Sequence, residues 1–396
     1  MKQLIQYLCG CLLLLEMIHC LSACSNEVLI GGERPVDRNT VEGATLAMTV
    51  KVAPRSGDAG SGADDPAEDA IHSLYVFVYN IGTSEYCEAQ SFTAYDLVEK
   101  DGRYTFQMKV TPGYKRFYLV ANPRTDFTRN LTSYTQEELQ RLKMSKLSDH
   151  IESEEEVISS DEIQQTLTAR GLPMAMSATG NINLISAAGK GSSGTTPDSP
   201  EDGEVKGELV LDGTHSNVFN LERAVAKVTL ICRVSPLVSN TTLDLDRLEI
   251  LQANSETYLF PKYIVSDDQW TTDWASMAEG ADLSRTVQYQ YGKQENNTGT
   301  DWEVYNRGTH YLYENYYGIT LSGDKQEGLI DETKYSRIHI VLTDGRDKTF
   351  PMSYLRRNDH VTVTLNILPS RIVCEIHPWS EEVIYPDYTT EIKGGG

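Results

Sequence analysis

The sequence predicts an all-β protein with minor helix, arranged as two β-sandwich domains. Runs rich in Val, Ile, Thr and Tyr recur along the chain, and these residue types favour strands. The runs do not alternate with long helical segments, which argues against the repeated strand–helix units of a parallel sheet. With 396 residues and 40% hydrophobic content, the chain is long enough to bury two cores. Two sandwiches are therefore the simplest architecture.

The N-terminus predicts an exported lipoprotein. Lys2 provides a short positive region, and residues 3–23 are mostly apolar. This stretch ends in Leu-Ser-Ala-Cys, which looks like a bacterial lipobox, in which Cys24 is lipidated and becomes the first residue of the exported chain. The alternative is an ordinary signal peptide with a chance cysteine. A transmembrane span is disfavoured because Glu16 interrupts the apolar stretch.

The first half of the chain is expected to hold strands and one helix. Residues 45–52 alternate strictly, and the apolar face of that strand consists of Leu46, Met48, Val50 and Val52. Residues 56–70 are rich in Gly, Asp and Ala and are typical of a flexible segment. A helix is expected at 135–143, where Thr135 and Glu138 have capping-box spacing. Further strands are expected at 73–80, 103–110, 114–123, 171–185 and 207–213.

The second half is expected to open with one long strand over residues 217–234. Residues 262–303 hold three of the four Trp and predict a long irregular excursion. Later strands are expected at 309–320, 336–342 and 360–368, followed by a C-terminal segment that Pro378 and Pro386 interrupt.

Composition and motifs exclude several function classes. A formal net charge of −22 argues against nucleic acid as a partner, because phosphate binding needs clustered Lys and Arg. No HExxH or GxSxG motif occurs, so we expect neither an enzyme nor a metal or cofactor. The three cysteines that follow Cys24 have no disulfide or zinc spacing. Two of them, Cys232 and Cys374, lie in apolar runs and are expected to be small core residues.

Motifs along most of the chain resemble the fimbrillins of Bacteroidetes, which are pilins made as lipoprotein precursors. In order along the chain, these motifs are LSAC, ATLAMTVKV with a nearby arginine, LYVFVYN, TPGYKRFYLVANP, ERAVAKVTL, YLYENYYG, RRNDHVTVTLNI and HPW. Two features depart from the family pattern: Glu16 in the signal segment and the Trp-rich excursion at 262–303. The resemblance implies two Greek-key, transthyretin-like sandwiches and places the precursor in the outer membrane and the mature protein in a cell-surface fimbria.

The resemblance also implies a route of assembly by proteolysis and strand exchange. An arginine-specific protease would cut the precursor and release its first strand, and a strand from another fimbrial subunit, of the same or a different kind, would fill the groove. Cutting after Arg34 or Arg38 would leave the strand at 45–52 attached, so we expect cleavage between Arg55 and Ser56. The expected segments are a signal peptide at 1–24, a propeptide at 25–55 and domains at 56–214 and 215–396.

The C-terminal segment 381–396 is the candidate donor strand. Val383 and Tyr385 would lie on one face of such a strand. The other face would carry Ile384, Tyr388 and Ile392. The alternative is a frayed tail that ends in three glycines.

The sequence is compatible with several roles in a fimbria. The chain could be a shaft or accessory subunit, an anchor that keeps its lipid, or a tip adhesin, and its receptor is not predicted. A function of another class, a glycan-binding outer-membrane lipoprotein, is suggested by the aromatic residues Trp270, Trp274 and Trp302 among nearby acidic residues. Loop packing by these tryptophans is the alternative explanation.

Overall fold

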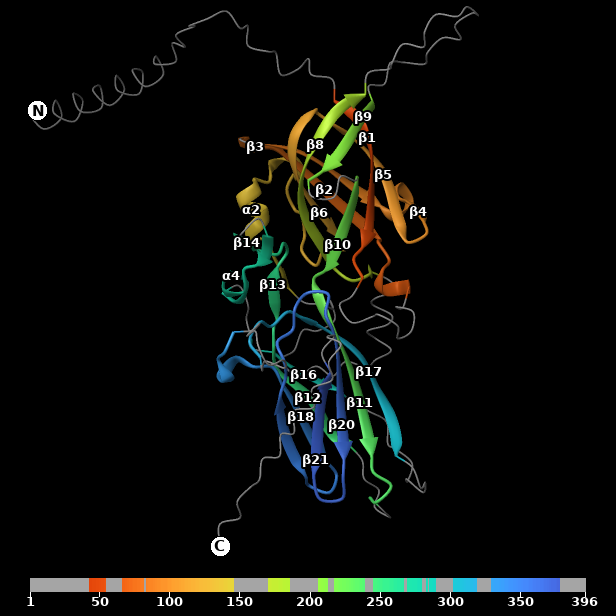
Figure 1. Ribbon diagram of the computed structural model, residues 1–396, viewed down its shortest axis with the longest axis vertical. Helices are drawn as coiled ribbons and strands as arrows, with labels where there is room; N and C mark the ends of the chain where they lie inside the picture. Colours follow the sequence, from red (N-terminus) through yellow and green to blue (C-terminus); the bar gives the residue numbers. More distant parts are fainter. Residues whose placement is uncertain are drawn as a thin grey trace, which may run out of the picture. The chain divides into compact units, whose positions relative to one another are not determined.

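The structure is a computed structural model of the chain (Figure 1). The residues that it describes are 43–54, 66–81, 83–145, 170–185, 206–212, 217–238, 245–266, 269–279, 283, 285–289, 302–318 and 329–377. Strands dominate this part of the chain and the helices in it are short, which confirms the predicted all-β class with minor helix. The expected helix is α2 (Gln136–Arg141), and its N-cap Thr135 accepts a hydrogen bond from the Glu138 amide as predicted.

The first part of the chain forms a nine-stranded sheet. Its order is β3-β2-β6-β8-β10-β1-β5-β4, and β9 pairs with both β1 and β8. The bounds are β1 (Ala44–Val52), β2 (Ser73–Asn80), β3 (Thr83–Thr93), β4 (Val98–Lys100), β5 (Arg103–Val110), β6 (Gly113–Ala121), β8 (Met174–Ile185), β9 (Lys206–Leu211) and β10 (Val218–Arg223). The sheet surrounds one hydrophobic core, to which each of these strands except β3 and β4 contributes at least two buried apolar side chains.

The second part forms two four-stranded sheets, of order β17-β11-β20-β21 and β16-β12-β18-β19. Their bounds are β11 (Val225–Val234), β12 (Leu245–Ala253), β16 (Arg285–Tyr289), β17 (Glu303–Tyr313), β18 (Arg337–Leu342), β19 (Asp347–Pro351), β20 (His360–Ile367) and β21 (Ile372–His377). Residues of both sheets, such as Leu230 of β11 and Ile250 of β12, share a second hydrophobic core. This is the packing of a β-sandwich.

Small elements lie between the strands of the three large sheets. Two short pairs are β7 (Lys143–Ser145) with β13 (Glu256–Tyr258), and β14 (Tyr263–Ser266) with β15 (Gln269–Thr272). The helix α4 (Trp274–Ala278) follows β15. Single turns of 3-10 helix are η1 (Pro66–Glu68), η2 (Ala94–Asp96), η3 (Leu131–Ser133) and η4 (Glu332–Lys334).

The long strand expected at 217–234 was a wrong prediction, because it is two strands in different sheets. β10 pairs with β8 and β1, whereas β11 pairs with β17 and β20. Ala224 separates them, and the buried positions change from odd numbers in β10 to even numbers in β11. One continuous strand presents alternate residues to a face, so this change of phase needs a break. β10 therefore belongs to the first sheet, although it follows the domain boundary expected after residue 214.

Candidate functional site

The first strand of the described chain, β1, has neighbours on both of its edges (Figure 1). On one side it pairs antiparallel with β5, from Ala44 opposite Val110 to Lys51 opposite Arg103. On the other side its second half runs parallel to β10, and Thr45 pairs with β9. β1 is thus an interior strand of the sheet, paired along nearly all of its β5 edge and at both ends of its other edge.

The inward face of β1 is part of the first core. Leu46, Met48 and Val50 are all 0% exposed, and Ala44 joins them on the same face. Val52, which was expected to complete the apolar face, is only half-buried, because it lies at the end where β1 leaves the core. The alternation predicted from the sequence is therefore present, with its buried part shifted toward the start of the strand.

Because Gly207 of β9 has no side chain, the start of β1 can pack closely against it. A Cβ atom at Gly207 would lie 2.6 Å from Cδ2 of Leu46 and 2.9 Å from Cβ of Ala44. Carbon atoms in ordinary contact are separated by about 3.5–4.0 Å. A side chain at position 207 therefore cannot coexist with these two β1 residues unless the strand moves.

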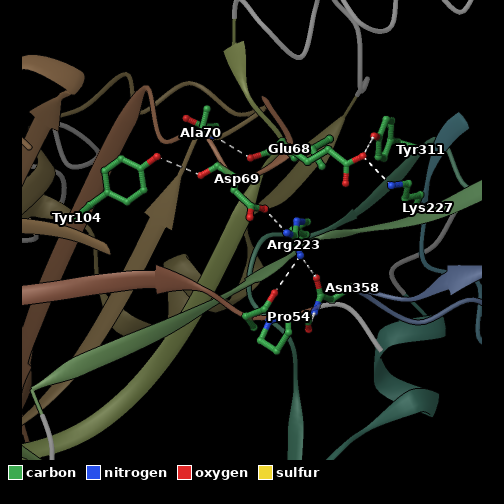
Figure 2. A network of polar contacts seen from close by, with 12 residues as sticks. Pro54, Glu68, Asp69, Ala70, Tyr104, Arg223, Lys227, Tyr311 and Asn358 are labelled. Carbon is green, nitrogen blue, oxygen red and sulfur yellow. Dashed lines mark hydrogen bonds and ion pairs between the residues drawn. The ribbon is translucent and has the colours of Figure 1, made fainter. Parts of the chain in front are cut away.

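The last residues before the expected cleavage site are held by side chains from distant parts of the chain. The Ala53 amide donates to the Leu221 carbonyl at 2.8 Å. Arg223 Nη1 donates to the Ala53 carbonyl at 2.9 Å, and Asn358 Nδ2 donates to the Pro54 carbonyl at 2.7 Å (Figure 2). Arg223 and Asn358 also bond to each other, at 2.6 Å between Nη1 and Oδ1.

The same contacts place Arg223 in a charged network. This guanidinium is 1% exposed, and it forms an ion pair with Asp69, which follows η1. The neighbouring Glu68 accepts from Lys227 Nζ of β11 at 2.9 Å and from the Tyr311 hydroxyl of β17 at 2.6 Å (Figure 2). A buried charge is tolerated only with such partners. The segment that follows the expected cleavage site is therefore tied both to the end of β10 and to the second sandwich.

Several of the predicted site residues lie outside the described residues. These are the lipidation site Cys24, the cleavage site Arg55 and Ser56, and the donor-strand candidates Val383, Ile384, Tyr385, Tyr388 and Ile392. Trp270 lies on β15, Trp274 begins α4, and Trp302 directly precedes β17 with its side chain 44% exposed. The glycan-binding alternative thus stays a prediction.

The cysteines behave as the sequence suggests. Cys232 and Cys374 are buried, free thiols in the second core. Both lie beside Leu365 of β20, one on each neighbouring strand. Burial raises the pKa of the Cys374 thiol to about 12, and the nearby Glu375 adds to this effect. A thiol with this pKa is a poor nucleophile at neutral pH.

The described residues contain no group of three or more His, Cys, Asp or Glu side chains that could hold a metal ion. Among the helices of these residues, none is long and apolar enough to cross a membrane.

The reasoning from sequence missed Gly207, Arg223, Asn358 and Asp69. Arg223 and Asn358 lie within the motifs ERAVAKVTL and RRNDHVTVTLNI, but their contacts join segments far apart in the chain. A sequence motif shows that these residues belong to a recurring pattern, but it does not show which distant residues they contact.

Residues 44–210 match the model of the family described as major fimbrial subunit protein (FimA). The match begins at the first residue of β1 and ends within β9. A comparison with curated proteins gives no match.

Three solved structures are similar to the chain at low sequence identity. The tip fimbrial protein Mfa3 from Porphyromonas gingivalis, with a C-terminal truncation, has 16% identity and a TM-score of 0.45, covering 85% of this chain and 98% of its own. A fimbrial assembly protein from Parabacteroides distasonis has 11% identity and a TM-score of 0.43, covering 85% and 96%. A fimbrilin from Porphyromonas gingivalis has 14% identity and a TM-score of 0.41, covering 85% and 98%.

Proposed function

We propose that the chain, whose residues 44–210 match the family of major fimbrial subunit proteins, is a subunit of a cell-surface fimbria that assembles by exchange of β1. In this proposal it is exported as a lipoprotein through Cys24, cut after Arg55 and completed by a strand from another subunit. The observation that carries the proposal is the position of β1, an interior strand that ends just before an arginine.

Cleavage at Arg55 would leave β1 without a covalent link to the rest of the sheet. β1 carries three fully buried large side chains, and burial contributes about 1.5–3 kcal/mol for each, or about 5–9 kcal/mol together. A typical domain has a net stability of about 5–15 kcal/mol. The cleaved subunit therefore needs a replacement strand to remain stably folded.

The vacated slot would have two open edges, because β5 and β10 would both lose their partner. Unpaired edges readily accept a strand from another chain. An incoming strand that takes the place of β1 would run antiparallel to β5 and parallel to β10. It would need a small residue opposite Gly207 in the place of Ala44, and larger apolar residues at the next alternate positions.

The end of the slot offers a feature that would set the register of the incoming strand. Arg223 and Asn358 donate to consecutive main-chain carbonyls in the present arrangement. After β1 leaves, the same donors could bind the carbonyls of its replacement. Every residue has a main-chain carbonyl, so these contacts would fix the register of the incoming strand without selecting particular side chains.

N-terminal sequencing of the protein in assembled fibres tests this function. We expect the assembled chain to begin at Ser56 and Arg55→Ala to accumulate as lipidated, unassembled precursor. Arg38→Ala is the matched control and should assemble normally. Fibres whose subunits retain residues 45–52 would contradict the proposal and would favour an anchor that keeps its first strand.

Deletion of residues 381–396 tests whether the chain is a shaft subunit or a tip subunit. A shaft subunit needs a donor strand for its neighbour, so the deletion should stop growth of the fibre at the truncated subunit. A tip subunit without a donor role would still be incorporated. Normal fibre growth after the deletion would exclude this segment as the donor.

A further inference from the structure

A buried lysine lies opposite an asparagine at one end of the first core. Lys115 of β6 is 1% exposed, and its residue pairs directly with Asn80 of β2. The next pair on the same face is Phe117 with Val78, which belongs to the core. An amine is seldom buried beside apolar residues, so its contacts need an explanation.

The amine contacts two oxygen atoms. Lys115 Nζ donates to Oδ1 of Asn80, and it also donates to Oγ1 of Thr111 at 2.5 Å. The Thr111 hydroxyl in turn donates to Oε1 of Glu88 at 2.6 Å. The Thr111 amide also donates to the Glu88 carboxylate, at 3.2 and 3.1 Å to its two oxygens. A continuous path therefore runs from amine through hydroxyl to carboxylate.

The topology puts these groups on one face of the sheet. Glu88 of β3 pairs with Val78 of β2, and Asn80 lies two residues along the same strand. Residues two apart in a strand share a face, and directly paired residues do as well. The amine, the carboxamide and the carboxylate thus point into the same end of the core.

Burial changes the acid–base balance of the amine. Removal from water lowers the pKa of Lys115, and the charge of Glu88 opposes that shift. A larger fraction of a buried lysine is neutral and nucleophilic than of an exposed one.

We propose that Lys115 and Asn80 join in an intramolecular isopeptide bond that links β6 to β2. The proposal does not depend on the exchange of β1, because neither β2 nor β6 is a neighbour of β1 in the sheet. It concerns a covalent modification that the chain would make by itself.

The reaction is balanced with the groups present. The charged amine passes one proton through the Thr111 hydroxyl to Glu88, and the neutral Nζ attacks Cγ of Asn80. The new bond between Nζ and Cγ forms as the bond between Cγ and Nδ2 breaks. Nζ gives up a second proton, Nδ2 takes one up, and ammonia leaves, so the product is a secondary amide. Glu88 then returns its proton to water, and no oxidant or cofactor is needed.

The bond would act on the sheet during assembly. β2 and β6 are adjacent strands on the β3 side of the sheet, while β1 lies beyond β8 and β10. A covalent link there would keep the β2–β6 pair together while the slot of β1 is empty. It would also resist separation of these strands when the subunit bears load.

Peptide mapping of the full chain tests the proposal. In the unmodified chain, trypsin cuts after Lys115 and releases residues 110–115. In the linked chain, Lys115 is not cut, and residues 110–116 appear joined to residues 56–100, lighter than the two peptides by one ammonia. Fragmentation must locate the link at Lys115 and Asn80. Complete recovery of free residues 110–115 from folded protein would overturn the proposal.

Substitutions distinguish a failure to form the isopeptide bond from a failure to fold. Lys115→Arg and Asn80→Ala should both lose the linked peptide completely. Glu88→Gln keeps an oxygen that can accept from Thr111, so it should fold but fail to link at neutral pH. Raising the pH should partly restore linking in Glu88→Gln, because solvent then removes the proton from Lys115. Linking at the same rate in Glu88→Gln and the unaltered chain would refute the role of Glu88.

Discussion

Substitution of Gly207 by alanine should destabilise the chain through β1. The new Cβ would lie 2.6 Å from Cδ2 of Leu46 and 2.9 Å from Cβ of Ala44. The Leu46 side chain can rotate, but the Cβ of Ala44 moves only with the backbone of β1. Overpacking of this kind costs about 1–3 kcal/mol, and we expect Gly207→Ala to lower the free energy of unfolding by that amount.

A double-mutant cycle with Leu46→Ala identifies the contact. Leu46→Ala alone should cost about 2–5 kcal/mol because it leaves a cavity in the core. In combination the two changes should cost less than their sum, by roughly 0.5–3 kcal/mol, because the truncated side chain makes room for the new methyl group. Ala44 still opposes the methyl group, so the recovery should be incomplete.

Urea unfolding of the uncleaved chain, followed by circular dichroism, measures these differences. The matched control is the double mutant of Leu74→Ala and Gly207→Ala. Leu74 of β2 is equally buried in the same core, but none of its atoms is among those nearest to a Cβ at Gly207. The control pair should be additive within about 0.5 kcal/mol. The reasoning fails if the Leu46 pair is also additive, or if Gly207→Ala alone costs nothing.

Three further predictions follow from other contacts. Arg223→Met should lower the free energy of unfolding by about 1–3 kcal/mol in urea unfolding, because the Ala53 carbonyl loses its charged donor, and an unchanged midpoint would contradict this. Asn122 has a φ of 48° and accepts hydrogen bonds from the His72 and Ser73 amides. Both Asn122→Ala and Asn122→Gly lose these bonds, but only glycine tolerates the backbone angle, so Asn122→Ala should melt well below Asn122→Gly. Equal melting temperatures would show that the backbone angle does not contribute. The Cys374 thiol stays protonated in the folded chain up to a pKa of about 12, while the unfolded thiol ionises near 9.0, so stability should fall as pH rises between these values. Cys374→Ala should remove that part of the decline, and the same pH slope in both chains would contradict it.

The local pattern of β1 could be predicted because alternation is a property of a few neighbouring residues. Leu46, Met48 and Val50 were expected on one face, and all three are buried. The half-buried Val52 was not foreseen, since where a strand leaves its core depends on what surrounds its end.

The strand β12 was not predicted, and Glu249 explains why. Leu248 and Ile250 point to the second core, but Glu249 between them is also buried, with its Oε2 2.6 Å from Nδ1 of His339. A buried carboxylate interrupts the pattern of apolar and exposed residues, and its partner comes from β18. Such a pair is visible only when both strands are in place.

The contacts of Lys115 at the candidate reactive site likewise depend on strands that are distant in the sequence. In the sequence Lys115 stands beside Arg116 near the start of the strand expected at 114–123, and nothing there marks it as a buried residue. Thr111 lies only four residues before it, but Asn80 and Glu88 come from other strands. Only the pairing of β6 with β2 and of β2 with β3 brings these two residues within reach.

By itself, the sequence determined the all-β class, the short capped helix and the apolar face of the strand that precedes Arg55, because each depends on residues close together in the chain. Only the tertiary structure decided that this strand is an interior one, parallel to β10, with Gly207 against its start and Arg223 and Asn358 at its end. Strand order and register join residues more than a hundred positions apart, and the alternation within one strand carries no information about which distant strand lies beside it.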